Sequence, residues 1–487
     1  VVSYVSIGVE VPTQFPAIDI CNHNAYDGNA TRDIMRDILS KSNLTVDSVN
    51  SLLEYSDLAD DYFKSVFENK SLHGELDTYD LGFYLSQMLI SCEYQGEPCS
   101  HSDFYWFRDY NYGNCYRFNG DDPDQMRKGH NNNDHVFKSK KSRLSSRPGH
   151  GLRLELYVGD PITQQQFTYE SGIRVIIHNQ SIVPLPDSSA GIDVTTGFLT
   201  NIGIRRNFVY KLPKPYNDCI CNLNDTTSYD SNEYTEEIRQ MIASKKMRVY
   251  QQDICLKLCN RDYFRRQCGC IDFSLLMLET NKNLTRCYSD RQIECLNQAN
   301  INYFNTDEFT NCYAKCPLSC HSIDYETKIT MSEYPTLWYA NLFKSAYKFI
   351  DYKKFYGQTP TFDLIKKTTL VVNIFYESIT YSSISEHPVM PFDLLLSSLG
   401  GYLGLFTGSS LLTFVEVIEF FILTALFVHK FRKTNLNSSC GSSGSNKLST
   451  TNNGQQKNGN NKNKKKEDDD DDKQIITTSN NHHQTKF

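Results

Sequence analysis

The chain has 487 residues, a formal net charge of −7 and 16 cysteines, and aromatic residues make up 13% of it. This length suits several ordinary domains or one large domain with tails. The charge is spread along the chain, which excludes a basic nucleic-acid-binding surface, so we expect no nucleic-acid partner. No Gly-x-Ser-x-Gly, His-Glu-x-x-His or phosphate-loop motif is present, so we expect no enzyme and no catalytic residue.

Apolar periodicity predicts the main elements in chain order. Residues 1–20 alternate apolar and polar and predict an extended strand. Helical spacing predicts helices within 30–90, the last leading from Tyr84 into Cys92, and 119–150 is polar and predicts a loop. Strands are predicted at 152–156, 173–177, 204–212, 325–329 and 370–375. Helices are expected within 233–320 and 337–356.

One segment, residues 392–428, is long and apolar enough to cross a bilayer. As a single helix it would measure about 55 Å against roughly 30 Å of hydrocarbon, so it either projects beyond the bilayer or breaks. We expect a break between Gly400 and Ser410, because glycine destabilises a helix and lets it unwind. Glu416 and Glu419 share one helical face, and intramembrane carboxylates usually face a bundle interior or a water path.

This pattern indicates a cation pathway, which requires an oligomer because one spanning helix cannot enclose a pore. Two alternatives stay open. Gly400, Gly404 and Gly408 recur every fourth residue, a spacing that often serves helix packing alone. Glu416 and Glu419 would instead lie near the cytoplasmic interface, since basic residues at 429–433 soon follow and place the C-terminus in the cytoplasm.

Fifteen of the 16 cysteines precede the membrane segment, which predicts an oxidising compartment before it and a reducing one after it. The dense spacing from Cys255 to Cys320 suits disulfides or zinc, and the setting with few histidines favours disulfides, so we expect no metal. Six sequons on the same side are glycosylation candidates: Asn29, Asn43, Asn69, Asn179, Asn224 and Asn283. The chain starts without Met or a leader, so we expect a first membrane helix to precede it in the full-length protein.

Several short motifs lie along residues 1–433. They are FPAI at 15–18 with CN at 21–22, CEYQGEPC at 92–99, GNCY at 113–116, GIRV at 172–175, LPKP at 212–215, and LGG at 399–401 followed by GLFTGSSLLT at 404–413. Together with the cysteine block they resemble the degenerin / epithelial sodium channel / acid-sensing ion channel family, in its peptide-gated branch.

The resemblance implies an α+β membrane protein that forms an acid-sensing-channel-like trimer, with two membrane helices in each full-length subunit. A large disulfide-rich extracellular domain would combine a palm β-sheet with a helical finger, thumb and knuckle. The implied ranges are 1–391 for this domain, 392–428 for the second transmembrane helix with the filter, and 429–487 for a disordered cytoplasmic tail. Within the extracellular domain, the finger lies at about 22–150, and the β-ball and palm strands at about 151–215 with 1–20 and 322–331. The thumb follows at about 219–320, the knuckle at about 337–365 and the last palm strand at about 369–378.

The resemblance also implies a disulfide connectivity, which spacing alone does not choose. The implied pairs are Cys21–Cys115, Cys92–Cys99, Cys219–Cys320, Cys255–Cys316, Cys259–Cys312, Cys268–Cys295 and Cys270–Cys287. Cys221 and Cys440 are left over. Cys440 is expected to be a free cytosolic thiol, and for Cys221 a free thiol and a bridge to another subunit both stay open.

The family pattern implies a selectivity filter at Gly408, Ser409 and Ser410. The implied pore-lining or pore-mouth residues are Asp393, Leu394, Ser398, Gly401, Leu405, Glu416 and Glu419. No cofactor is expected; Na⁺ is the permeant ion, and Ca²⁺ is a second candidate because a threefold axis would turn Asp393 into a ring of carboxylates. Expected partners are the lipid bilayer, sister subunits in a homo- or heterotrimer, and an extracellular peptide. The protein would be multi-pass in the plasma membrane, with the C-terminus in the cytoplasm.

The proton-sensing residues of the family are largely replaced. Ser398, Asn297 and Ile301 stand where acid-sensing members usually carry Asp, and Glu170 remains without a near acidic partner, so proton gating is not expected. The leading hypothesis is an amiloride-sensitive-type, sodium-permeable channel opened by an extracellular ligand such as a neuropeptide. The alternatives are a mechanically gated or constitutively open channel of this family, and a pore-less single-span receptor or adhesion ectodomain.

Overall fold

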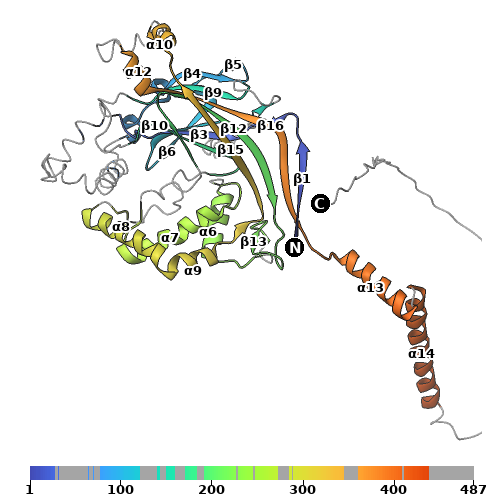
Figure 1. The fold of residues 1–487 in the computed structure, drawn as a ribbon. Coiled ribbons are helices and arrows are strands. Elements are labelled where there is room, and N and C mark those ends of the chain that lie inside the picture. Colours follow the sequence, from blue (N-terminus) through green and yellow to red (C-terminus); the bar gives the residue numbers. More distant parts are fainter. Residues whose placement is uncertain are drawn as a thin grey trace, which may run out of the picture. The chain divides into compact units, whose positions relative to one another are not determined.

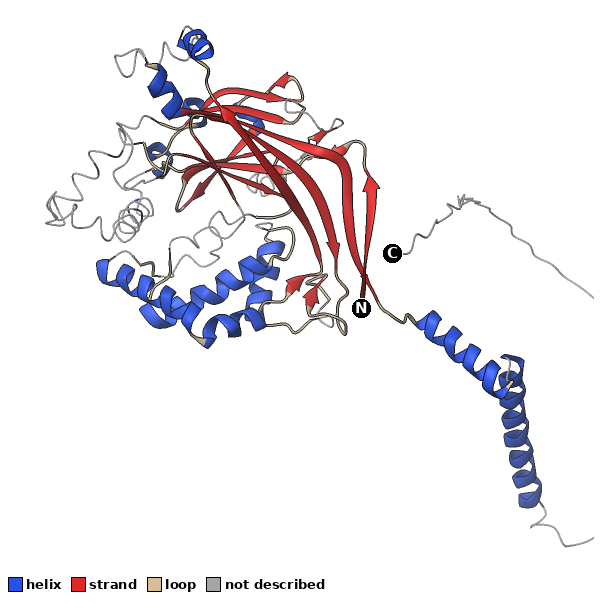
Figure 2. Ribbon diagram, viewed as in Figure 1, coloured by secondary structure: helices blue, strands red, loops and turns tan. Residues whose placement is uncertain are grey.

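The computed structural model describes residues 1–27, 31, 34, 64, 70, 77–120, 140–142, 150–159, 170–183, 191–225, 229–244, 247–272, 285–287, 289–344, 360–408 and 411–437. The chain divides into two compact units, Val1–Phe392 and Asp393–Phe487. The first unit combines β-sheets with helices, and the described part of the second is helical (Figure 1, Figure 2). The boundary lies one residue after the predicted end of the extracellular domain at 391.

The larger sheet of the first unit has seven strands in the order β15-β12-β16-β9-β4-β5, with β1 also paired to β16. Its strands are β1 (Val2–Val9), β4 (Leu89–Tyr94), β5 (Glu97–Pro98), β9 (Leu152–Tyr157), β12 (Phe198–Tyr210), β15 (His321–Glu333) and β16 (Thr369–His387). β12 and β16 run parallel, and the remaining pairs are antiparallel. The first residues of β16, 369–374, are all buried, which matches their apolar character apart from Thr369 and Asn373.

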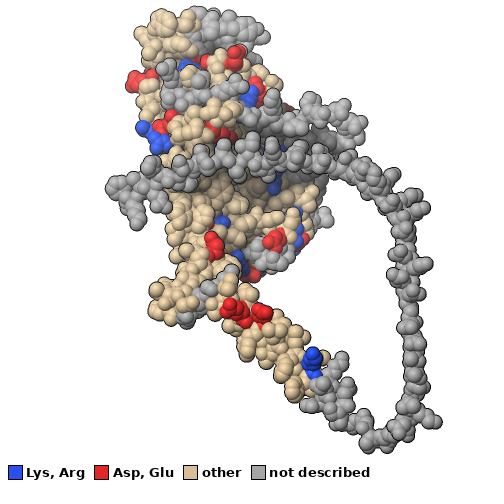
Figure 3. All heavy atoms as spheres, turned by 90° about the vertical axis from the view of Figure 1, so that its right-hand side faces the viewer, with Lys and Arg blue, Asp and Glu red and all other residues tan. Residues whose placement is uncertain are grey.

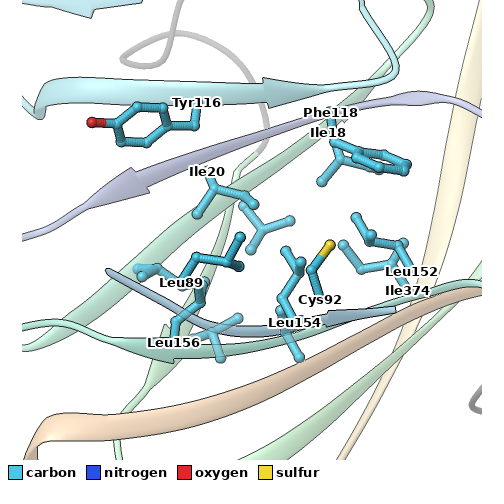
Figure 4. Packing of buried hydrophobic residues seen from close by; sticks show 14 of the residues in the cluster. Ile18, Ile20, Leu89, Cys92, Tyr116, Phe118, Leu152, Leu154, Leu156 and Ile374 are labelled. Carbon is cyan, nitrogen blue, oxygen red and sulfur yellow. The ribbon is translucent and has the colours of Figure 1, made fainter. Parts of the chain in front are cut away.

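A second sheet has the order β11-β10-β3-β7-β6. Its strands are β3 (Ala17–Asn22), β6 (Phe104–Asp109), β7 (Gly113–Phe118), β10 (Gly172–His178) and β11 (Ile192–Thr195). Ile18 and Phe118 of this sheet share a hydrophobic core with Leu152, Leu154 and Ile374 of the larger sheet (Figure 4). Two short pairs complete the strands: β2 (Thr13–Gln14) with β8 (Lys141–Ser142), and β13 (Cys219–Ile220) with β14 (Leu318–Ser319).

The helices of the described residues are η2 (Thr78–Leu81), α4 (Leu85–Met88), η3 (His101–Asp103), α6 (Glu233–Ala243), α7 (Gln252–Cys268), α8 (Asp290–Asn305), α9 (Asp307–Lys315), α10 (Leu337–Lys344), α12 (Phe362–Thr368), α13 (Phe392–Thr407) and α14 (Leu411–Asn437). Four of them, α6 to α9, carry a core that is separate from that of the sheets. Ile238 of α6, Leu258 and Tyr263 of α7 and Tyr303 of α8 are buried together. Asn232 begins α6 by accepting hydrogen bonds from the first backbone N–H groups.

Disulfides reinforce this helical part. All seven pairs that the family resemblance implies are bonded in the structure. Two of them, Cys255–Cys316 and Cys259–Cys312, form successive rungs between α7 and the end of α9, because each helix presents cysteines four residues apart on one face. Each such bridge typically contributes about 2–4 kcal/mol by restricting the unfolded chain.

Two predicted boundaries are wrong. The helix predicted from Tyr84 into Cys92 ends at Met88, and Leu89 begins β4, because pairing with β9 and a tight turn at Gln95 and Gly96 outweigh the local helical pattern. The turn needs positive φ at both residues, 56° and 85°. The last palm strand was predicted to end at 378 but runs to His387, since its second half pairs with β1.

Other predicted elements lie partly outside the described residues. The helices expected before residue 77 and most of the loop at 119–150 fall there. The helix expected at 337–356 is seen as α10, Leu337–Lys344, and the rest of that range is not described. The predicted strands at 152–156, 173–177, 325–329 and 370–375 are confirmed, each inside a slightly longer strand. The strand predicted at 204–212 is part of β12 and ends at Tyr210.

A buried ionic cluster ties three strands of the second sheet together. Asp19 of β3 is fully buried and accepts hydrogen bonds of 2.6 and 2.9 Å from the Arg117 guanidinium of β7. The Nε2 atom of His178, on β10, lies 3.3 Å from the same carboxylate. Burial alone would raise the pKa of Asp19, but the charges of Arg117 and His178 prevail and lower it to about 2.

We predict that Asp19→Asn destabilises the folded protein by about 3–5 kcal/mol, because it leaves Arg117 buried beside a neutral amide. Because the pKa of Asp19 is lowered on folding, its contribution is fully present above its ordinary value of 3.8 and is lost as the pH falls towards 2. Thermal unfolding followed at several pH values measures both effects.

The control is Glu308→Gln, which removes an exposed ion pair with Arg266. Such a pair contributes only about 0–1 kcal/mol. Equal melting temperatures for Asp19→Asn, Glu308→Gln and the unaltered protein would contradict the importance of the buried cluster.

Candidate functional site

The apolar segment of the second unit is interrupted at Gly408. α13 ends at Thr407 and α14 begins at Leu411. Gly408 has φ +62°, and its N–H donates to the Gly404 carbonyl over 3.1 Å, the geometry with which a left-handed glycine terminates a helix. The break therefore lies at the end of the predicted range 400–410, while Gly400 and Gly401 remain inside α13. Ser409 and Ser410 lie outside the described residues.

Among the described residues, one helical stretch, Leu412–Arg432, is long and apolar enough to cross a membrane. Its 21 residues rise about 32 Å, which matches the hydrocarbon thickness of a bilayer. The shorter apolar stretch Phe392–Phe406 precedes it. The segment predicted at 392–428 therefore consists of two helices, α13 and α14, separated within the range where a break was predicted. The tail predicted as disordered from 429 is helical to Asn437, since no glycine or proline occurs there to end the helix.

The predicted pore residues are divided between these two helices. Asp393 opens α13, and four of the residues recur at spacings of four, three and four, so they share one face of that helix: Leu394, Ser398, Gly401 and Leu405. Glu416 and Glu419 lie in the first half of α14, and basic residues occur only near its end (Figure 3).

The positions of Glu416 and Glu419 bear on their role. Along the helix, Glu416 precedes Lys430 by about 21 Å and Glu419 precedes it by about 17 Å. That separation disfavours the alternative in which both carboxylates lie at the same interface as the basic cluster. They belong instead to the part of α14 that follows the break at Gly408.

An ionisable cluster in the first unit was missed by the sequence analysis. His23 has a side chain that is 7% exposed; its Nδ1 lies 3.1 Å from a Glu170 oxygen, and its Nε2 lies 3.3 Å from an Asp193 oxygen. Arg174 donates to Asp193 over 3.0 Å. The expectation that Glu170 has no near acidic partner is therefore corrected: Glu170 and Asp193 bind one imidazole. Strand β11 pairs with β10 so that Asp193 lies opposite Arg174, and this pairing places Asp193 near Glu170, which precedes β10. Local sequence does not reveal such a pairing.

Burial lowers the pKa of His23 from its usual 6.5, against the opposing effect of the Asp193 and Glu170 carboxylates. Asn297 and Ile301, two of the other positions considered for proton sensing, lie on α8, where Ile301 is 58% exposed. His23 is therefore a buried histidine whose pKa lies below its usual value, so folding disfavours its protonated form.

We predict that the melting temperature falls as the pH is lowered below 6.5, with part of the fall due to His23. Its pKa is lower in the folded state, so the unfolded chain binds the proton first and acid favours unfolding. His23→Gln should flatten this dependence, whereas His101→Gln, an exposed histidine in η3, should not. Identical pH slopes for His23→Gln and the unaltered protein would refute the assignment.

Two of the six glycosylation candidates lie among the described residues. Asn179 follows β10 at a turn, and Asn224 is exposed in the turn after β13. Both are placed where a glycan would not disturb a strand or helix, which agrees with glycosylation but does not require it. Asn29, Asn43, Asn69 and Asn283, and also Cys440, lie outside the described residues.

A disulfide-rich α+β unit joined to a helix that can span a bilayer defines a class of membrane proteins with one large folded domain. Residues 2–420 match the family model described as amiloride-sensitive sodium channel. The chain belongs to this family, which comprises degenerin, epithelial sodium and acid-sensing channels, so it is related to ion channels rather than to enzymes.

Three relatives illustrate the match. The epithelial sodium channel subunit gamma of Neoceratodus forsteri is 26% identical over 72% of this chain. The acid-sensing ion channel 2 of Danio rerio is 25% identical over 83%, and the human bile acid-sensitive ion channel is 26% identical over 84%. The matched region spans 48% of the gamma subunit and 69% and 72% of the other two relatives, so it covers about half of the first and more of the others.

Proposed function

We propose that the chain is a subunit of a trimeric, sodium-permeable plasma-membrane channel of the amiloride-sensitive type, opened by an extracellular ligand such as a neuropeptide. The observation that carries the proposal is the interruption of the apolar segment at Gly408, between α13 and α14. In this proposal the first unit lies outside the cell and the C-terminus lies in the cytoplasm, as the basic residues after the membrane segment favour.

The break supplies what a sodium filter needs. Irregular backbone at membrane depth is tolerated where it lines a water-filled path, and its carbonyl groups then replace part of the hydration shell of an ion. The small residues Gly408, Ser409 and Ser410 keep such a point narrow without blocking it. Asp393 before the filter and Glu416 and Glu419 after it would attract cations from both sides.

The isolated chain supports an oligomer. The side chains of α14 from Leu412 to Arg432 are exposed in a single chain, although most of them are apolar. A helix that is apolar on all sides needs lipid or other helices around it, and one α13–α14 pair cannot enclose a passage. Three copies arranged around an axis, as in the proposed trimer, would bring the face of Leu394, Ser398, Gly401 and Leu405 to that axis.

Ligand gating fits the rigidity of the first unit. The disulfide rungs hold α7 and α9 together, and β16 ends at His387, five residues before α13 begins. A ligand that binds the open form more tightly shifts the equilibrium by its difference in affinity, and opening requires several kcal/mol. Two relatives are named for the acid and the bile acid that they sense, which supports a chemical stimulus.

Two other functions remain as alternatives. A mechanically gated or constitutively open channel of this family would use the same pathway with a different stimulus. A pore-less receptor or adhesion ectodomain would leave Glu416 and Glu419 within an apolar helix without a role, at a cost that membrane proteins normally avoid.

We predict that replacing Ser410 by Phe in the full-length protein abolishes the current or changes the sodium-to-potassium permeability ratio while surface expression persists. A bulky ring would obstruct a passage that only small residues leave open. Ser102→Phe, at an exposed position in η3, serves as the control and should leave permeation unchanged. Unaltered permeability ratios across several Ser410 substitutions would reject the filter assignment.

We further predict that the full-length channel, expressed alone or with sister subunits, opens to a peptide but not to acid alone. The replaced carboxylates at Ser398, Asn297 and Ile301 leave protons little free energy to deliver to a gate. The measurement is current during separate peptide, pressure and acid steps, the last from neutral pH to about pH 5. A large transient inward current under acid alone would overturn this prediction, and a response to pressure alone would favour the mechanical alternative.

A further inference from the structure

Three cysteines gather where the helical part of the first unit meets the larger sheet. Cys219 and Cys221 flank Ile220 on and beside β13, and Cys320 follows β14 directly. β13 and β14 run parallel, with Ile220 opposite Ser319, and the Cys320 N–H donates to the Ile220 carbonyl over 3.1 Å. Because Ile220 lies between Cys219 and Cys221, this hydrogen bond holds Cys320 beside both cysteines.

Cys320 has two bonding partners in this arrangement. Its Cα lies 5.1 Å from that of Cys219 and 4.9 Å from that of Cys221, and both distances suit a disulfide. The three Sγ atoms lie within 4.8 Å of one another. Cys219 and Cys221 are two residues apart in an extended segment, so their side chains leave the same side of it. A sulfur atom in a disulfide holds one partner, so Cys320 bonds only one of the two at a time.

The rest of the cysteine inventory agrees with one unpaired thiol. Fifteen cysteines precede the membrane segment, and twelve of them form the six disulfides outside this cluster. The two candidates for the thiol differ in surroundings. Cys219 is fully buried, with its Sγ 3.5 Å from the Leu212 carbonyl oxygen, which a thiol can use as a weak acceptor. Cys221 is exposed.

We propose that Cys219, Cys221 and Cys320 form a thiol–disulfide exchange site in which Cys320 is bonded to either of the other two. The Cys221 thiolate attacks the Sγ atom of Cys320, the Cys320–Cys219 bond breaks, and Cys219 leaves as a thiolate that takes up the proton released by Cys221. One disulfide is lost and one is formed, so no oxidant or reductant is consumed. The proposal rests on the placement of this unit in an oxidising extracellular compartment.

Exchange would change which cysteine reacts with solutes. With Cys219 bonded, the exposed Cys221 thiol is open to small disulfides, which would add one mixed disulfide and release one thiol. With Cys221 bonded, the remaining thiol is buried against Leu212 and protected. The cluster is therefore a modification site that reacts with small disulfides when Cys221 carries the thiol and does not react when Cys219 carries it.

The cluster is connected, through residues 211–217, to the strand that precedes the membrane segment. The Lys211 N–H donates to the Cys320 carbonyl over 2.8 Å. The next residue, Leu212, donates its N–H to Glu386 near the end of β16 over 3.0 Å, and the Asn217 amide donates to the same carboxylate over 2.6 Å. The residues around Cys219 thus hold the end of β16, which gives the exchange a direct structural link to that strand.

The test uses the full chain carrying Cys440→Ser, which removes the thiol of the tail. The unreduced protein is unfolded in denaturant at mildly acidic pH, which stops exchange and exposes both cysteines, and is then alkylated with N-ethylmaleimide, digested and mapped by mass spectrometry. We expect one alkylated cysteine per chain before the membrane segment, divided between Cys219 and Cys221, together with peptides that link each of them to Cys320. Recovery of a single linkage overturns the exchange, and so does the absence of alkylation, which would indicate a bridge to another subunit.

Two matched variants give a second measurement. Cys219→Ser and Cys221→Ser should each abolish the alkylation, because Cys320 then bonds the cysteine that remains. Alkylated Cys320 in Cys219→Ser would show that Cys221 does not reach it and would overturn the proposal. Addition of oxidised glutathione should attach one glutathione to Cys221 in the unaltered protein and none in Cys221→Ser. The mapping of the unaltered chain decides the matter even where a variant fails to fold.

Discussion

The central strand β16 is the constraint on which the first unit depends. Its first residues, Thr369–Ile374, are buried on both faces, and the strand pairs with β9 on one side and with β12 on the other before its second half pairs with β1. Strands with both faces covered need apolar side chains throughout, which the run from Leu370 to Val372 provides. Segments from both ends of the chain are thereby fixed to one strand.

The parts attached to that strand are stabilised in two ways, by an apolar core between the sheets and by disulfides among the helices. The two sheets share an apolar core, in which Phe118 and Ile18 pack with Leu152 and Ile374. The helices α6–α9 bury many aromatic and cysteine side chains, but Ile301, Phe304 and Tyr313 stay exposed, so only part of their apolar area is removed from water. Covalent rungs such as Cys259–Cys312 offset this by reducing the freedom of the unfolded chain.

The second unit is stabilised differently. Its helices are apolar, but within a single chain the described residues give them no apolar surface to pack against. α14 is long enough to cross a bilayer, and a break that begins at Gly408 separates it from α13. In lipid, the freed backbone groups near that glycine need water, ions or neighbouring helices as partners. Membership of a sodium-channel family and this local requirement lead to the same proposal of an oligomeric cation pathway.

The sequence by itself determined the features that depend on local pattern: the apolar membrane segment, the strands predicted at 152–156 and 173–177, and the motifs that imply the family and its disulfide pairs. The tertiary structure decided the features that depend on distant partners. Leu89 belongs to a strand because β9 lies beside it, and β16 extends to His387 because β1 pairs with it. His23 meets Glu170 and Asp193, and Cys320 meets two cysteines, only once β-pairing has brought separate segments together. Local periodicity carries no information about such contacts, since their free energy arises between residues far apart in the chain.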